Sequence, residues 1–217
     1  MLRRQIRQAE PVGVEQPDTQ PTDGAMTSAK GDDVAADDTN AAVGREIVNP
    51  VSGERIIIRQ SGAQTGGKLL AFDLYLPPGG HVPARHAHPA QQETFTVVEG
   101  QMRFRLGRRT IIAQPGQTIA IPIGVAHWFG NAGTQVAHAR VEVRPALRMQ
   151  ELFETTEALG QASHARGAWL IQLASLARIV LEFQREVAVP DVPAPLVRLA
   201  LAPLAMLGRR AERAASR

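Results

Sequence analysis

Hydrophobic and polar residues alternate along short segments in the middle of the chain. In residues 68–76, one face carries Leu70, Phe72, Leu74 and Leu76, and the other carries Ala71, Asp73 and Tyr75. Further strands are expected over residues 55–59, 94–99, 101–106, 109–113, 118–121 and 135–144. A period of two is typical of strands that bury one face. Gly and Pro separate these segments, so the pattern predicts a mainly β domain, either a sandwich or a barrel.

The spacing of hydrophobic residues becomes helical after Pro145, which we expect to be the first residue of a helix. Three helices are expected, over residues 146–159, 168–187 and 196–207. The second has a broad apolar face. We expect Pro203 to interrupt the third helix, Gly208 to end it, and the basic tail beyond it to fray.

The first part of the chain has a different composition. Residues 1–45 are rich in Ala, Asp, Gly, Thr, Gln and Pro and contain almost no large apolar side chains, so we expect a disordered tail. The predicted organisation is therefore a tail over 1–45, a β domain over 46–145 and a helical extension over 146–217.

Composition and charge narrow the function classes. The 217 residues include no cysteine, so disulfides and thiolate metal sites are excluded, and any metal must bind nitrogen and oxygen ligands. The net charge is +3 and most arginines are dispersed, which argues against nucleic-acid binding. We expect a cytoplasmic location, because no secretory signal and no apolar stretch of membrane-spanning length is visible.

Three histidines and a glutamate form the pattern with the clearest chemistry. His86 and His88 are two residues apart on a predicted strand, so their side chains point to the same face. Glu93 has the wrong parity for a continuous strand, and we therefore expect a bend at Pro89 that turns it back towards the histidines. His127 follows a Pro-x-Gly turn and can approach from another strand. A lone histidine is usually a core or surface residue, but the joint spacing makes chance a poor explanation.

Three imidazoles and one carboxylate suit a divalent transition metal. Fe(II), Mn(II), Ni(II) and Zn(II) all accept this ligand set, and the ligands alone do not choose among them. Four protein ligands on an octahedral ion leave two positions for substrate, water or oxygen, which is what catalysis by a metal requires.

These residues resemble the two signature motifs of the cupin superfamily. The first motif is matched by Gly80, His86, His88, Glu93 and Gly100, and the second by Gly116, Pro122, Gly124, His127 and Asn131. The resemblance covers about residues 46–145 and implies a single double-stranded β-barrel (jelly-roll). By the same resemblance, His86, His88, Glu93 and His127 are the metal ligands. The helical part is similar to that of a group of bacterial single-cupin proteins without an assigned reaction.

Several side chains are candidates to act beside the metal. They are Tyr75, Gln92, Glu99, Trp128 and the polar face of residues 135–144. An apolar pocket wall, or simply a packed core, is expected from Phe95, Val97, Met102, Phe104, Ile121 and Phe129. We interpret Tyr75 as a solvent-facing or rim residue, and His138 as part of a solvated strand face.

For the helical extension, the favoured interpretation is a structural cover that packs on the barrel or on a partner subunit. A membrane-surface anchor and an attached DNA-binding domain are the rival interpretations. Two functions remain open. The first is a metal-dependent enzyme, an oxygen-using oxidoreductase of the dioxygenase kind, acting on a small organic molecule, although isomerase or lyase chemistry also fits the superfamily. The second is a non-catalytic binding or sensor module. A homodimer is also expected.

Overall fold

A computed structural model describes residues 42–49, 52–166 and 169–215. We expected a tail over residues 1–45, and its first 41 residues lie outside the described part of the chain. Residues 42–44 form a turn that leads into the first strand.

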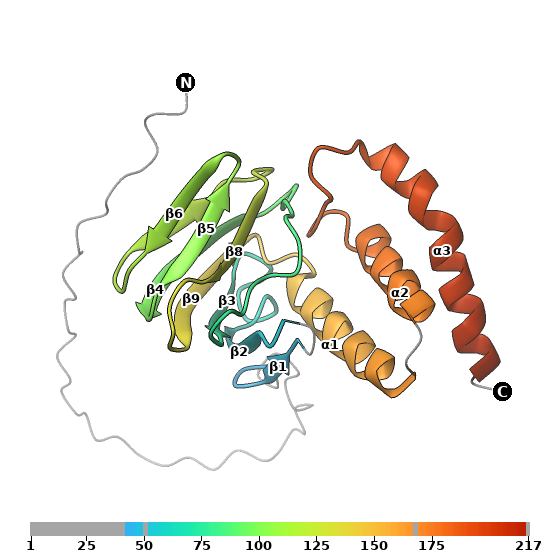
Figure 1. Ribbon diagram of the computed structural model, residues 1–217, viewed down its shortest axis with the longest axis horizontal. Coiled ribbons are helices and arrows are strands. Elements are labelled where there is room, and N and C mark those ends of the chain that lie inside the picture. The colour runs from blue at the N-terminus through green and yellow to red at the C-terminus, as the bar shows by residue number, and fades with distance from the viewer. Residues whose placement is uncertain (1–41, 50–51, 167–168, 216–217) are drawn as a thin grey trace, which may run out of the picture. The chain divides into compact units, whose positions relative to one another are not determined.

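In the part of the chain that the structure describes, nine antiparallel strands form two sheets (Figure 1). They are β1 (Glu46–Val48), β2 (Arg55–Gln60), β3 (Leu70–Leu76), β4 (Gln92–Glu99), β5 (Met102–Leu106), β6 (Arg109–Ala113), β7 (Thr118–Ile121), β8 (His127–Asn131) and β9 (Ala137–Arg144). The larger sheet has the order β1-β2-β3-β9-β4-β7, and the smaller one has the order β6-β5-β8. This mainly β, jelly-roll architecture confirms the predicted fold class.

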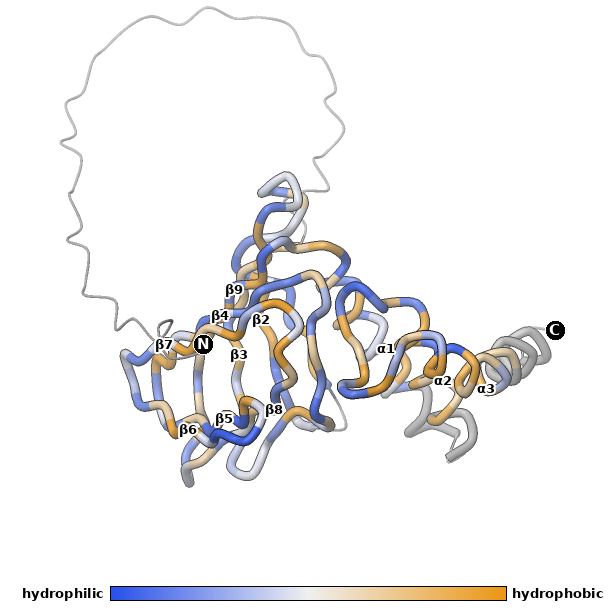
Figure 2. The backbone as a smooth tube through the Cα atoms, turned by 90° about the horizontal axis from the view of Figure 1, so that it is seen from above, coloured by the Kyte–Doolittle hydropathy of each residue, from blue (hydrophilic) through white to orange (hydrophobic). Residues whose placement is uncertain are grey.

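The alternation read from the sequence matches the burial of the strands, and the hydropathy colours of Figure 2 follow it along the backbone. In β9, Ala137, Ala139, Val141 and Val143 are buried. They lie opposite Leu76, Leu74, Phe72 and Leu70 of β3, and the inward faces of both sheets meet in one core. The predicted pocket-wall residues Phe95, Val97, Met102, Phe104, Ile121 and Phe129 are all buried in this core.

One edge of the smaller sheet is continued by a segment that is not a regular strand. His81 and His86 each form an isolated antiparallel bridge with β8, to Gly130 and His127 respectively. The expectation that His86 and His88 lie on a strand is therefore wrong in detail, since this stretch contains only isolated bridges. The extended backbone still gives both histidines a common direction.

The helices are α1 (Met149–Arg166), α2 (Trp169–Glu182) and α3 (Ala194–Ala215). Pro145 is not the first helical residue, because residues 145–148 form a turn in which Leu147 has a φ of 44°. Likewise α2 ends at Glu182, short of the predicted residue 187, because the chain then turns back to the strands.

The third helix differs most from its prediction. It continues through both Pro203 and Gly208, where an interruption and an end were expected. A proline leaves the carbonyl four residues earlier without its helical donor. That residue is Leu199, which is 75% exposed, so water can hydrate the freed carbonyl and the helix tolerates the proline.

The helical extension covers one end of the β domain. Met149, Leu152 and Phe183 are buried in the same core as the strands, and α2 packs between α1 and α3 (Figure 1). This packing agrees with the structural-cover interpretation. Among the described residues, no helix is both long and apolar enough to cross a membrane.

The outward face of the large sheet carries a charged cluster rather than a fully solvated surface. Asp73 is buried there, with Oδ1 3.1 Å from Nε2 of His138 and Oδ2 bonded to Arg59. The ring of His138 stacks on Tyr75 and its side chain is only 15% exposed, so the solvated-face interpretation of His138 is wrong. The cause is the partner strand, which brings Asp73 and Tyr75 beside it.

Gln91 joins the β domain to the start of the helical extension. Its side chain is 0% exposed, and Nε2 donates to the carbonyls of Pro145 (3.0 Å) and Ala146 (2.9 Å). Replacing Gln91 with leucine should lower the free energy of unfolding by about 1–3 kcal/mol, because the buried Ala146 carbonyl and the partly buried Pro145 carbonyl lose a donor. Urea unfolding tests this. Gln92→Leu, at the neighbouring exposed position, should change it by less than about 0.5 kcal/mol, and equal effects would contradict the prediction.

Candidate metal centre

The structure brings together the four side chains that the sequence singled out. One nitrogen or oxygen atom from each of His86, His88, Glu93 and His127 lies within 4.8 Å of all the others. His88, Glu93 and His127 are buried, while His86 is partly exposed. These four residues are called the histidine–glutamate cluster below, and they could hold a metal ion.

Local backbone features position each member of the cluster. His86 and His127 exchange backbone hydrogen bonds of 2.9 and 2.8 Å, which fixes the two rings beside each other. The chain turns at Pro89 and Ala90, as the bend required, and Glu93 follows near the start of β4. His127 begins β8, directly after a turn in which Gly124 has a φ of 75°.

The Nδ1 atom of each histidine is hydrogen-bonded to a backbone carbonyl. His86 bonds to Ala84 (3.0 Å), His127 bonds to Val125 (3.0 Å), and His88 forms a short bond to Glu186. A carbonyl only accepts, so Nδ1 carries the proton in each ring. A neutral ring then has its lone pair on Nε2, which is the arrangement found in histidine metal ligands.

The facing nitrogen and oxygen atoms of the cluster are arranged better for binding a metal ion than for hydrogen-bonding to one another. Among the described residues, the buried Nε2 atoms of His88 and His127 have no hydrogen-bond partner, and neither does Oε2 of Glu93. Both nitrogens lie 3.3 Å from that oxygen. Ligands about 2.1 Å from a common ion are roughly 3 Å apart when adjacent and roughly 4 Å apart when opposite. The spacing therefore matches a ligand set around one point.

The electrostatics of the cluster favour the protonation states that metal binding needs at His86 and Glu93, but not at His88. Burial, together with the neighbouring His127 and His88, lowers the pKa of His86 to about 4. Burial alone would raise the pKa of Glu93, but His88 and His127 outweigh it and hold that pKa far below its ordinary value. For His88, the lowering effect of burial is outweighed by Glu93, so its pKa is raised. A metal would take the place of the proton that Glu93 attracts to His88.

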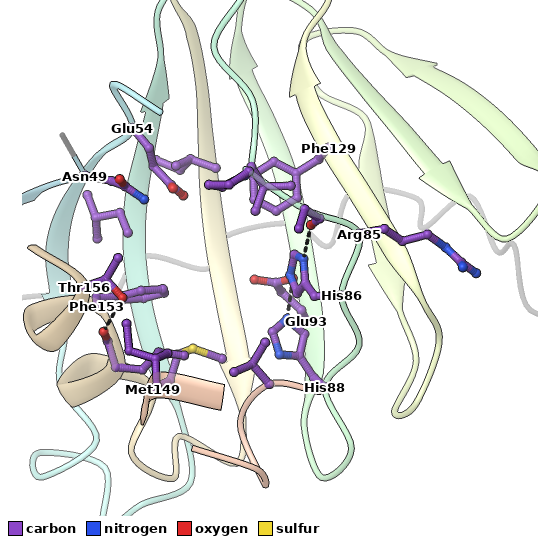
Figure 3. A pocket seen from close by; sticks show the side chains of 18 of the residues that line it. Asn49, Glu54, Arg85, His86, His88, Glu93, Phe129, Met149, Phe153 and Thr156 are labelled. Carbon is purple, nitrogen blue, oxygen red and sulfur yellow. Dashed lines mark hydrogen bonds and ion pairs between the residues drawn. The ribbon is translucent and has the colours of Figure 1, made fainter. Parts of the chain in front are cut away.

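A cavity of about 310 Å³ opens beside the cluster (Figure 3). His86, His88 and Glu93 form one part of its wall. Apolar residues from three regions form most of the remainder: the strands, α1 and α2. They include Phe72, Leu74, Phe95, Phe129, Met149, Leu152, Phe153 and Ile179. An apolar wall with a few convergent polar groups is typical of a small-molecule site.

Two polar residues in this cavity were not anticipated from the sequence. Glu54 and Asn49 come from the turn between β1 and β2, and Figure 3 shows them across the cavity from the cluster. A signal was present, since Glu54, Ile56 and Ile58 share one strand parity and all three are buried. Extending the alternation one step before β2 would have placed Glu54 inside.

The Glu54 carboxyl should make the free energy of unfolding depend on pH. Burial, and then repulsion from Glu93, raises its pKa from 4.5 to about 7, while hydrogen bonds from Ser52 and Asn49 oppose the shift. A raised folded-state pKa means that the stability present below pH 4.5 is lost as the pH rises through about 7. Glu54→Gln removes this loss, so the variant should gain up to about 3 kcal/mol relative to wild type over that range.

Urea unfolding of metal-free protein at a series of pH values measures this difference. Glu99→Gln, at an exposed position in β4, is the matched control and should show no such trend. A difference between wild type and Glu54→Gln that stays constant with pH would contradict the prediction.

The other candidates named from the sequence do not reach the cavity. Tyr75, Gln92, Glu99 and Trp128 are absent from its lining, as are the polar residues of β9. Arg55 lies over the ring of Tyr75 and Arg105 lies over Trp128, so both aromatic rings pack on outward faces. Of the predicted apolar wall, Phe95 and Phe129 line the cavity, whereas the other four residues only pack in the core.

Comparison with known proteins gives a family match and similar solved structures. Residues 72–143 match the family described as Cupin domain. The match runs from β3 to β9 and contains all four cluster residues. No curated protein matches the chain.

Two solved structures illustrate the structural similarity. A sugar phosphate isomerase from a cupin superfamily, from Silicibacter pomeroyi, is 24% identical, with 44% of this chain and 61% of that chain covered and a TM-score of 0.39. A predicted oxalate decarboxylase from Thermotoga maritima is 18% identical, with 49% and 96% covered and a TM-score of 0.43. The present chain therefore spans less than two thirds of the isomerase.

Proposed function

The chain carries a cupin domain, and we propose that it is a metal-dependent oxidoreductase that uses dioxygen to oxidise a small, largely apolar organic molecule. His86, His88, Glu93 and His127 would hold the metal in this proposal. The observation that supports it best is the position of the cluster, which forms part of the wall of an apolar cavity. A ligand in that cavity would therefore lie against the metal.

The metal, the backbone carbonyls and the apolar wall would each have a separate role. A bound divalent metal would supply a Lewis acid and a redox centre. The three backbone carbonyls that accept from Nδ1 would hold the imidazoles in one tautomer and orientation. The apolar wall would exclude water and select a substrate with few charges. Fe(II), Mn(II), Ni(II) and Zn(II) all suit the ligand set, but Zn(II) has no redox chemistry, and oxygen chemistry favours Fe(II).

Oxygen consumption tests the proposal. Protein purified without oxygen, analysed for its metal content and reconstituted with Fe(II) should consume oxygen when supplied with some member of a panel of phenols and 2-keto acids. Water proton relaxation of the Mn(II)-loaded protein should also reveal an exchangeable water on the metal. An exchangeable water without any oxygen uptake across the panel would contradict the oxidoreductase proposal.

The alternative is a non-catalytic binding or sensor module, whose metal would be structural or would hold a ligand. A structural metal predicts a pocket filled by side chains, and the cavity of about 310 Å³ beside the cluster argues against that version. The absence of an exchangeable water on the bound metal would favour it. The homodimer and the cytoplasmic location expected from the sequence remain predictions.

A further inference from the structure

The cavity has a second polar end, formed by Glu54 and Asn49. In Figure 3 their side chains lie across the cavity from His86, His88 and Glu93. Residues between the two ends are largely apolar, among them Phe72, Leu74 and Phe129. A molecule that touched both ends would be apolar along its length and polar at its two tips.

The burial of Glu54 has no structural compensation by a positive charge. Glu54 is 9% exposed, and within the described part of the chain no arginine, lysine or histidine forms an ion pair with it. Its carboxyl is 3.5 Å from the Ser52 hydroxyl, and its backbone N–H donates to the same hydroxyl. A buried carboxyl without a cation lowers stability, and such groups are enriched at functional sites.

Backbone hydrogen bonds connect Glu54 and Gly53 to Asn49. The backbone of Asn49 donates to the carbonyl of Glu54 (2.8 Å) and accepts from Gly53 (2.9 Å). Gly53 has a φ of 69°, and a Cβ atom there would lie 3.2 Å from Pro77. These bonds hold the backbone of Glu54, whose side chain lines the cavity.

We infer that Glu54, assisted by Asn49, binds a hydroxyl group at the end of an elongated apolar substrate whose opposite end lies at the histidine–glutamate cluster. This inference rests on the proposed function, because it assumes that the substrate also reaches the metal. Desolvation of Glu54 favours the neutral carboxyl, which both donates and accepts a hydrogen bond, as a hydroxyl partner requires. An ammonium group would instead need an ionised carboxylate.

Co(II)-loaded protein and synthetic hydroxamates provide the test, since hydroxamates bind metals through oxygen and Co(II) spectra report that binding. The probes are phenyl hydroxamates with zero to three methylene groups between the ring and the hydroxamate. Each is compared with its 4-hydroxy and 4-aminomethyl derivatives. With the spacer of matching length, the 4-hydroxy probe should bind wild type about tenfold more tightly than the unsubstituted one.

Variants assign this preference to Glu54. Glu54→Leu should abolish the tenfold preference, whereas Glu54→Gln, whose neutral amide still hydrogen-bonds, should retain most of it. Thr156→Val is the matched control, because the Thr156 hydroxyl lines the cavity but already donates to the Leu152 carbonyl at 2.8 Å. It should leave the preference unchanged. Circular dichroism and cobalt content confirm that each variant is folded and loaded.

The outcomes separate this inference from the proposed function. Spectral changes with no hydroxyl preference, or a preference that survives in Glu54→Leu, would overturn the inference and leave the open metal site intact. Tighter binding of the 4-aminomethyl probe, lost in Glu54→Gln, would overturn it in favour of cation recognition by a carboxylate. If no hydroxamate changed the Co(II) spectrum, the proposed function would fail and the inference would fail with it.

Discussion

Replacing His88 with alanine is expected to remove most of the bound metal and to lower metal affinity by more than about 100-fold. The loss of an outer-shell partner alone costs 10–100-fold, and the loss of a ligand should cost more. The effect should be large because His88 Nε2 lies 3.3 Å from Glu93 Oε2 and has no hydrogen-bond partner among the residues that the structure describes. Metal analysis after dialysis, and Co(II) titration against a chromophoric chelator, measure the change.

His81→Ala is the matched control for this prediction. His81 lies on the same extended segment, but its Nδ1 is hydrogen-bonded to the Val82 carbonyl and its side chain is outside the cluster. The control should keep the affinity of wild type. Both variants should keep the far-ultraviolet circular dichroism of the β domain. Full metal occupancy in His88→Ala would mean that the histidine–glutamate cluster is not the metal site.

Replacing Ala188 with proline is expected to weaken metal binding by about 10–100-fold, although Ala188 is not a ligand. After α2 the chain pairs with the segment that carries the histidines, and Ala188 and Ala87 exchange backbone hydrogen bonds of 2.9 and 3.1 Å. Two residues earlier, the Glu186 carbonyl accepts from Nδ1 of His88. Proline has no N–H and cannot donate to the Ala87 carbonyl, so one of the two bonds is lost and the carbonyl that orients His88 should shift.

Ala188→Ser separates this backbone effect from any effect of the side chain. Serine retains the N–H, so its metal affinity should stay within about threefold of wild type. The same chelator titration applies, together with thermal melting to confirm that both variants are folded. An unchanged affinity in Ala188→Pro would show that the helical extension covers the domain without supporting the metal centre.

The local signals in the sequence were sufficient for the β domain and for the cluster. Alternation with a period of two predicted the buried faces of β3 and β9, because a half-buried strand must alternate. The parity of His86 and His88 and the bend before Glu93 predicted a common centre, because residues two apart in extended backbone share a face and a bend changes the parity of the residues after it.

Local sequence patterns did not predict the surroundings of residues that contact distant segments of the chain. His138 looked solvated, because nothing near it in the sequence shows that β3 brings Asp73 alongside. Pro203 looked like a helix break, because its cost depends on whether the carbonyl of Leu199 can reach water. Both errors concern the surroundings of a residue, which only packing decides.

The sequence by itself therefore determined a mainly β domain and four residues that could hold one metal ion, because both follow from residue type and short-range spacing. The tertiary structure alone decided the environment of those residues. It placed α1 and α2 over the cavity, used the Glu186 carbonyl to orient His88, and set Glu54 across from the cluster. These contacts join residues far apart in the chain, and their free energies depend on the burial that the complete fold creates.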